Sequence, residues 1–226
     1  MTLYQLADPD SICPISRNSR REDLACVGIQ SLGLLLALGG VATLVALAGA
    51  YASATKIVSF SIYGATLIAL YAFSTLYHAS RRPKRKQFLA IVDQSSIYLL
   101  IAGTYTPLML VTLAGGWGWS LFGVVWGMAL LGVSIKVLFH NRFEAISLTL
   151  YLVMGWLVVI GFAPLLESLP TGGIWLIFAA GITYTAGVPV YLWKRMPYNH
   201  AMWHMFVLGG SSSFYFAFLF YVLPES

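Results

Sequence analysis

The sequence predicts an all-α membrane protein: a seven-transmembrane helix bundle with a cytoplasmic N-terminus and an outside C-terminus. Three observations predict it, namely the composition, seven long apolar runs and a one-sided distribution of basic residues. Of the 226 residues, 59% are apolar and only 9% are charged, whereas a soluble domain carries roughly 25% charged residues. The net charge of +5 is expected to reflect cytoplasmic loops, so no nucleic-acid partner is predicted.

The apolar runs set the domain organisation. Each is close to the ~20 residues that cross a bilayer as a helix, and all are too long and too uniformly apolar for barrel strands. They form one predicted domain, residues 27–223, after a polar cytoplasmic tail at residues 1–26. The predicted spans are 27–50, 57–78, 88–113, 118–138, 145–166, 173–192 and 201–223.

The basic residues predict the orientation. With the tail inside, twelve lysines and arginines lie on the inner side and only Lys56 lies outside, which is the bias typical of cytoplasmic loops. The cluster Arg81–Lys86 is interpreted as a topology anchor, with a lipid-headgroup site as the alternative. The inner residues are Arg17, Arg20, Arg21, Arg81, Arg82, Lys84, Arg85, Lys86, Lys136, Arg142, Lys194 and Arg195.

Several other residues have a plainer interpretation. Cys13 and Cys26 match no metal-binding spacing and are predicted to face the reducing side, so no disulfide is expected. His140 is expected to be a solvated loop residue. A proline inside a membrane-spanning helix can kink that helix. Kinks are therefore predicted at Pro107, Pro164 and Pro189.

The stretch His200-Ala-Met-Trp-His204 opens the last span. Side chains four positions apart on a helix lie one turn above each other, so both imidazoles can face one point. An ionisable group in a membrane span is costly and usually faces a partner, a cavity or a metal. The pair is therefore a candidate bidentate metal clamp.

Three further polar residues are predicted to lie at the same membrane level. His78 ends the second span, Asp93 opens the third, and Ser74 lies on the face of His78 one turn deeper. Under the predicted topology, all of these residues are at the cytoplasmic ends of their spans. A shared site is possible only because they are not separated by the ~30 Å of hydrocarbon.

Three imidazoles with an open fourth position are typical of a catalytic zinc site. His78, His200 and His204 are the candidate ligands of Zn²⁺. Asp93 could hold a metal-bound water or take its proton, or it could instead hydrogen-bond the free ring nitrogen of a ligand. H-x-x-x-H alone is a weak signal, since such pairs are more often simply packed or hydrogen-bonded side chains.

The ordered motifs resemble those of a known family. Ser74-x-x-x-His78, Asp93, the stretch Ala102-Gly-Thr-Tyr-Thr-Pro107 and His200-x-x-x-His204 are similar to the hemolysin III proteins of bacteria. These are relatives of the progestin and adipoQ receptors and, more distantly, of the alkaline ceramidases. The resemblance covers all seven spans and implies a multi-pass protein of the bacterial inner membrane. It also implies zinc on the three histidines, Asp93 on the zinc-bound water and Ser74 beside it.

Three functions are considered. The first is a zinc-dependent hydrolase of a lipid amide or ester at the cytoplasmic side, with Asp93 managing the proton and Ser74 donating to the oxyanion. The second is a membrane sensor or regulator of membrane homeostasis with a structural zinc. The third is a pore-forming hemolysin, which is disfavoured because an ion path is normally lined by polar or charged groups and spans four to six carry few. A membrane lipid is the expected substrate or ligand, and the oligomeric state is left open.

Overall fold

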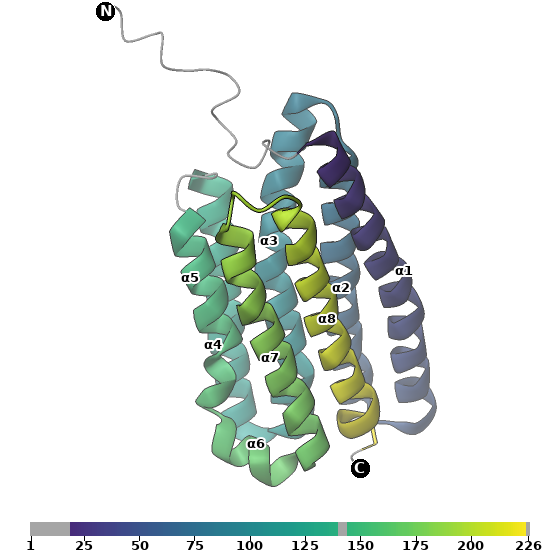
Figure 1. Ribbon diagram of the computed structural model, residues 1–226. Coiled ribbons are helices and arrows are strands. Elements are labelled where there is room, and N and C mark those ends of the chain that lie inside the picture. The colour runs from purple at the N-terminus through teal and green to yellow at the C-terminus, as the bar shows by residue number, and fades with distance from the viewer. Residues whose placement is uncertain (1–18, 140–143, 225–226) are drawn as a thin grey trace, which may run out of the picture.

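The computed structural model describes residues 19–139 and 144–224, and in these ranges the chain is an all-helical bundle (Figure 1). Six helices are long and apolar enough to cross a membrane, and a bent helix pair makes a seventh candidate span. The predicted fold class is confirmed. The helices are α1 Arg20–Tyr51, α2 Ala54–Ala79, α3 Pro83–Pro107, α4 Gly115–Phe139, α5 Glu144–Gly155, α6 Phe162–Ser168, α7 Thr171–Leu192 and α8 Asn199–Ala217, and π-helical turns Leu108–Thr112 and Phe218–Val222 continue α3 and α8.

Helix α1 begins well before its apolar run. The Ser19 side chain accepts a hydrogen bond from the backbone N–H of Glu22, at 3.2 Å, and Glu22 and Asp23 lie in the first turn. A serine cap and first-turn carboxylates both stabilise a helix N-terminus. The helix therefore extends to Arg20, into the segment that was expected to be a tail.

Helix α3 is the central element of the bundle. In its most apolar stretch 72% of the residues are buried, against 22% in α1 and 28% in α4. It packs against both α2 and α4, and Pro83 starts it at a position where a missing N–H costs little. Residues on α3 thus face protein on most sides, and Asp93 lies about three turns into this helix.

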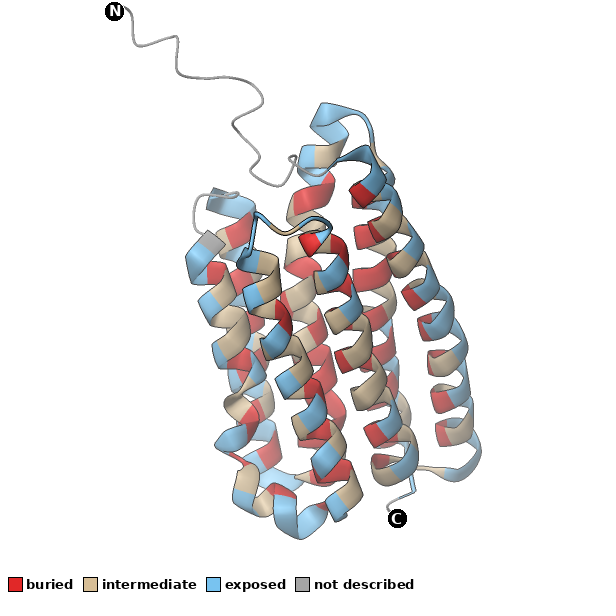
Figure 2. Cartoon of the chain, viewed as in Figure 1, coloured by how far each residue is buried: buried red, intermediate tan, exposed pale blue. Residues whose placement is uncertain are grey.

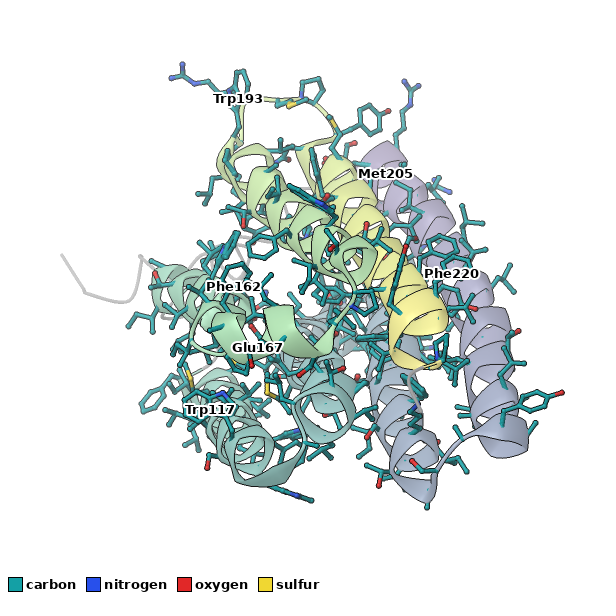
Figure 3. All side chains as sticks on the ribbon, turned by 90° about the horizontal axis from the view of Figure 1, so that it is seen from below. Trp117, Phe162, Glu167, Trp193, Met205 and Phe220 are labelled. Atoms are coloured by element: carbon teal, nitrogen blue, oxygen red, sulfur yellow. The ribbon has the colours of Figure 1, made fainter. Side chains whose placement is uncertain are left out.

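The outer surface of the bundle is apolar. Buried residues follow the inner faces of the helices, and exposed ones face outward (Figure 2). Large apolar side chains such as Leu35 and Trp175 are among the exposed residues. Met205 and Phe220 lie on the periphery around α8 when the bundle is seen along its axis (Figure 3). Apolar surface on this scale indicates contact with lipid.

The fifth span is broken where one straight helix was expected at 145–166. Residues Ala145–Val159 and Phe162–Ser168 enclose an angle of 53°. Pro164 lies in the first turn of α6 and has no N–H with which to continue the helical ladder. Tyr105 on α3 compensates for the break, because its hydroxyl donates to the Gly155 carbonyl at 2.9 Å and accepts from the Val158 N–H at 2.7 Å. Backbone groups at membrane depth need such partners.

The ends of α2 and α8 that carry the histidines lie at the same end of the bundle, at the top of Figure 1. This end is called the histidine end below. The N-terminal side of α1 and the start of α3 also lie there. The assignment of this end to the cytoplasm stays a prediction from the distribution of basic residues.

Candidate metal centre

The centre is built around a close pair of imidazoles. The Nε2 atoms of His78 on α2 and His204 on α8 lie 3.0 Å apart, and both residues are only 4% exposed. Two nitrogens bound tetrahedrally to one zinc at ~2.0–2.1 Å would lie ~3.3 Å apart. The observed separation therefore suits a shared metal ion as well as it suits a hydrogen bond.

His200 places a third imidazole beside this pair, although it does not belong to the group of close ligand atoms that His78 and His204 form with Cys26. Its ring centroid lies 5.0 Å from that of His78 and 4.7 Å from that of His204. Its Nε2 atom is buried and makes no hydrogen bond with any residue that the structure describes. A buried nitrogen without a partner is costly, and a metal ion would satisfy it. The i, i+4 spacing has thus placed both α8 histidines against His78.

A carboxylate fixes the orientation of His78. Asp23 Oδ1 lies 2.9 Å from His78 Nδ1, and Asp23 Oδ2 accepts from Lys86 Nζ at 2.7 Å. When Nδ1 donates to a carboxylate, the lone pair of a neutral imidazole is on Nε2. His78 is therefore held in the tautomer that can bind a metal through the atom facing His204.

Gln30 on α1 plays the corresponding part for His204. Its side chain is almost fully buried, and its Nε2 atom lies 2.9 Å from His204 Nδ1 and donates to Ser74 Oγ at 2.6 Å. Its Oε1 atom makes no hydrogen bond with any described residue. An amide presents either its N–H₂ or its carbonyl, depending on which way it is turned. As placed, the N–H₂ group faces Nδ1, so metal binding through His204 Nε2 requires the amide to be turned over, with Oε1 accepting the Nδ1 proton.

A cysteine completes the cluster. Among the described residues, the ligand atoms of Cys26, His78 and His204 all lie within 4.8 Å of one another and could hold a metal ion. Cys26 is fully buried and forms no disulfide; Cys13 lies outside the described residues. Imidazole and thiolate are ligands that suit zinc, so the donor set fits the ion implied by the histidines.

Asp93 and Ser74 lie beside the histidines. Together with Gln30, His200 and His204, they line one end of a cavity of about 170 Å³. Ser74 is 1% exposed and hydrogen-bonds the Asp93 carboxylate. The structure therefore places the predicted carboxylate and hydroxyl in a cavity with two of the three candidate ligands.

The cavity continues away from the metal centre into the bundle. Along α3 its lining runs from Asp93 to Leu108, about 22 Å at ~1.5 Å per residue. Beyond the polar end, most of its lining side chains are apolar, among them Leu100, Ile101, Ile177, Phe178, Val207 and Phe214. Its far part reaches Gly155 and Trp156 at the break in the fifth span. This shape suits a ligand with one polar end and a long apolar body.

The five residues predicted from the sequence thus meet at one end of the bundle. The ligand roles of the three histidines and the catalytic roles of Asp93 and Ser74 stay predictions. Helix α1 was missed as a contributor: Glu22, Asp23, Cys26 and Gln30 all reach the centre. Their spacing puts Asp23, Cys26 and Gln30 on one helix face, and Ser19-x-x-Glu22 is a capping-box pattern. These signals are in the sequence, but the predicted boundary between the tail and the first span, at residues 26 and 27, separates Asp23 and Cys26 from Gln30. His140 lies outside the described residues.

Comparison with known proteins agrees with this description. Residues 29–215 match the family model described as "Haemolysin-III related". The chain is 42% identical to hemolysin-3 of Bacillus cereus over 206 residues, which are 91% of this chain and 94% of that protein. It is 45% identical to the hemolysin-3 homolog of Bacillus subtilis (strain 168) over 201 residues, 89% and 94% of the two chains.

A more distant match is a human protein, the monocyte to macrophage differentiation factor. It is 28% identical over 165 residues, covering 69% of this chain and 67% of that protein. The match along most of the chain, the six to seven candidate spans and the bacterial relatives lead to one conclusion. The chain is a multi-pass integral membrane protein and belongs to the haemolysin-III related family.

Proposed function

We propose that this protein is a zinc-dependent hydrolase of a lipid amide or ester, acting at the cytoplasmic side of the membrane. The observation that carries the proposal is the single cavity that joins the histidine cluster to a long apolar chamber, with Asp93 and Ser74 at the junction. A reacting carbonyl could lie beside the histidines while its acyl chain occupies the chamber. A detergent-like or lipid substrate is the chemical class that such a cavity fits.

The residues that would hold the ion are His78, His200 and His204. A zinc ion bound there lowers the pKa of water to ~7 and polarises a carbonyl. His78 is oriented by Asp23, and Gln30 would orient His204 in the same way once its amide is turned so that Oε1 faces Nδ1. Such outer partners typically change metal affinity by ~10–100-fold.

Asp93 is assigned as the general base and Ser74 as the hydrogen-bond donor to the developing oxyanion. Asp93 is the carboxylate at the polar end of the cavity and takes the proton when water adds to the carbonyl. Ser74 stands between Asp93 and Gln30, so its hydroxyl is held in place. Hydrolysis then gives a carboxylic acid and an amine or alcohol, and the proton passes from Asp93 to the leaving group.

A sensor with a structural metal is the second candidate, and Cys26 favours it. Structural zinc sites have four protein ligands and no open position. Cys26, His78 and His204 form one close group of ligand atoms, and the His200 ring beside His78 would supply the fourth ligand. On this reading, the zinc holds α1, α2 and α8 together and the cavity binds a lipid without converting it.

Asp93→Asn separates the two candidates. In detergent-purified protein given a long-chain N-acyl amine or the matching acyl ester, hydrolysis is expected to fall roughly 10²–10⁴-fold while zinc content is unchanged, because only the proton acceptor is removed. Glu167→Gln is the matched control, since Glu167 is an exposed carboxylate at the other end of the bundle. Unchanged turnover in Asp93→Asn, or no turnover of either lipid by the zinc-loaded wild type, would favour the sensor.

A further inference from the structure

We infer that Cys26 is a fourth metal ligand, whose thiolate closes the centre to water in the resting protein and must leave before a substrate can be hydrolysed. This inference rests on the metal centre of the proposed function and adds a regulatory state to it. It concerns which of the protein's own atoms bind the ion, so metal spectroscopy can test it without a known substrate.

The position of the sulfur carries the inference. Cys26 Sγ lies within 4.8 Å of the ligand nitrogens of both His78 and His204. In a tetrahedral zinc site, a sulfur at ~2.3 Å and a nitrogen at ~2.0–2.1 Å from the ion are ~3.6 Å apart. The two separations therefore differ by at most about 1.2 Å, which a side-chain rotation can cover. Cys26 is also fully buried, so no solvent competes for it.

The unpartnered nitrogen of His200 is an independent sign that an ion belongs here. Its Nε2 is buried without a hydrogen bond, while its ring lies 5.0 Å from the His78 ring. His200 lies outside the close group of Cys26, His78 and His204, so an ion held by that group would satisfy this nitrogen after a small turn of the His200 ring. Binding would release the proton of the thiol, as metal binding by cysteine does.

Helix α1 is anchored so that the backbone of Cys26 stays beside the histidines. Asp23, one turn earlier, is bound to His78 and to Lys86. Glu22 accepts from the backbone N–H of His200 at 3.1 Å, and Gln30, one turn later, contacts His204. Hydrogen bonds on both sides of Cys26 thus tie α1 to the two helices that carry the histidines.

The fourth ligand has a chemical consequence. A zinc site with four protein ligands is closed, whereas a catalytic site keeps one position for water or substrate. With Cys26 bound, the centre is structural; with Cys26 displaced, the three histidines remain and the centre is open. With α1 held in place, a lipid entering the chamber would make the exchange by turning the Cys26 side chain away from the ion, so Cys26 is the regulatory residue.

The test is cobalt substitution of the full-length protein in detergent. Cys13→Ser is introduced first, so that Cys26 is the sole thiol of the chain. Bound Co²⁺ is expected to show a thiolate-to-cobalt charge-transfer band, and zinc is expected to protect Cys26 from alkylation by a maleimide. Cys26→Ser should lose the band and lower zinc affinity by roughly 100-fold or more, since even outer partners are worth ~10–100-fold. His200→Ala should keep the band, because the group of Cys26, His78 and His204 remains.

The outcomes distinguish this inference from the proposed function. Tetrahedral cobalt without a thiolate band, with the same spectrum in Cys26→Ser, would overturn the role of Cys26 and leave the three-histidine centre intact. Absence of any bound cobalt or zinc in the wild type would overturn both. A band that is present and then lost when a long-chain N-acyl amine is added would support the exchange directly.

Discussion

The histidine end and the break in the fifth span both place polar groups inside an apolar bundle, but they satisfy them in different ways. At the break, one hydroxyl of Tyr105 serves a backbone carbonyl and a backbone N–H. At the histidine end, side chains orient other side chains and one ring nitrogen keeps no partner. Buried polar groups with complete hydrogen bonding are structural, whereas an incomplete set at a cluster of ligand atoms indicates a ligand.

This comparison also explains how one cavity can touch both regions. The chamber begins at Asp93 and His200 and ends near Gly155, where the helix is interrupted. The break is stable because of Tyr105, and it contributes the far wall of the chamber. Substitutions at the two ends should have separable effects, on metal binding at one end and on stability at the other.

The largest effect is expected for His204→Ala. His204 faces His78 at 3.0 Å and belongs both to the three-histidine set and to the group with Cys26. Zinc affinity should fall by more than the ~10–100-fold that is typical of outer partners, and hydrolysis should disappear with it. Metal analysis after equilibrium dialysis measures this. Retention of stoichiometric zinc at wild-type affinity would contradict the shared centre.

Asp23→Asn should have the next largest effect. The change keeps the shape of the side chain but weakens the hydrogen bond that orients His78, so zinc affinity should fall by ~10–100-fold. Competition with a chelator measures the affinity. Lys86→Met is the control. It removes a partner of Asp23 and not a partner of His78 itself, so the fall in zinc affinity should be smaller. Equal loss in the two variants would show that charge at this end, and not ligand orientation, sets the affinity.

Tyr105→Phe tests the other side of the comparison and should give the smallest effect. It leaves the Gly155 carbonyl and the Val158 N–H without their partner, which is expected to cost ~1–3 kcal/mol. The free energy of unfolding in detergent should fall by this amount while zinc content is unchanged. Tyr51→Phe is the control because Tyr51 is exposed at the end of α1. Loss of zinc in Tyr105→Phe would mean that the two regions are coupled.

The sequence by itself determined the fold class of the protein and the end of the bundle at which its candidate ligand histidines lie. Span length and hydropathy are properties of each segment alone, so an all-helical membrane bundle could be predicted from composition and the apolar runs. The i, i+4 spacing of His200 and His204 is equally local. Once the order of spans was known, His78, Asp93 and Ser74 followed to the same end of the bundle.

Only the tertiary structure decided which groups surround the histidines. Helix α1 begins before its apolar run does, because the cap at Ser19 starts the helix in a polar stretch. Hydropathy therefore assigned Asp23 and Cys26 to a tail, although both are helical. Their partners His78 and His204 are distant in the chain, and no spacing rule specifies such contacts. The break in the fifth span depends likewise on Tyr105 of another helix. Local pattern fixes where a helix can form, but the hydrogen bonds between helices decide what each buried polar group does.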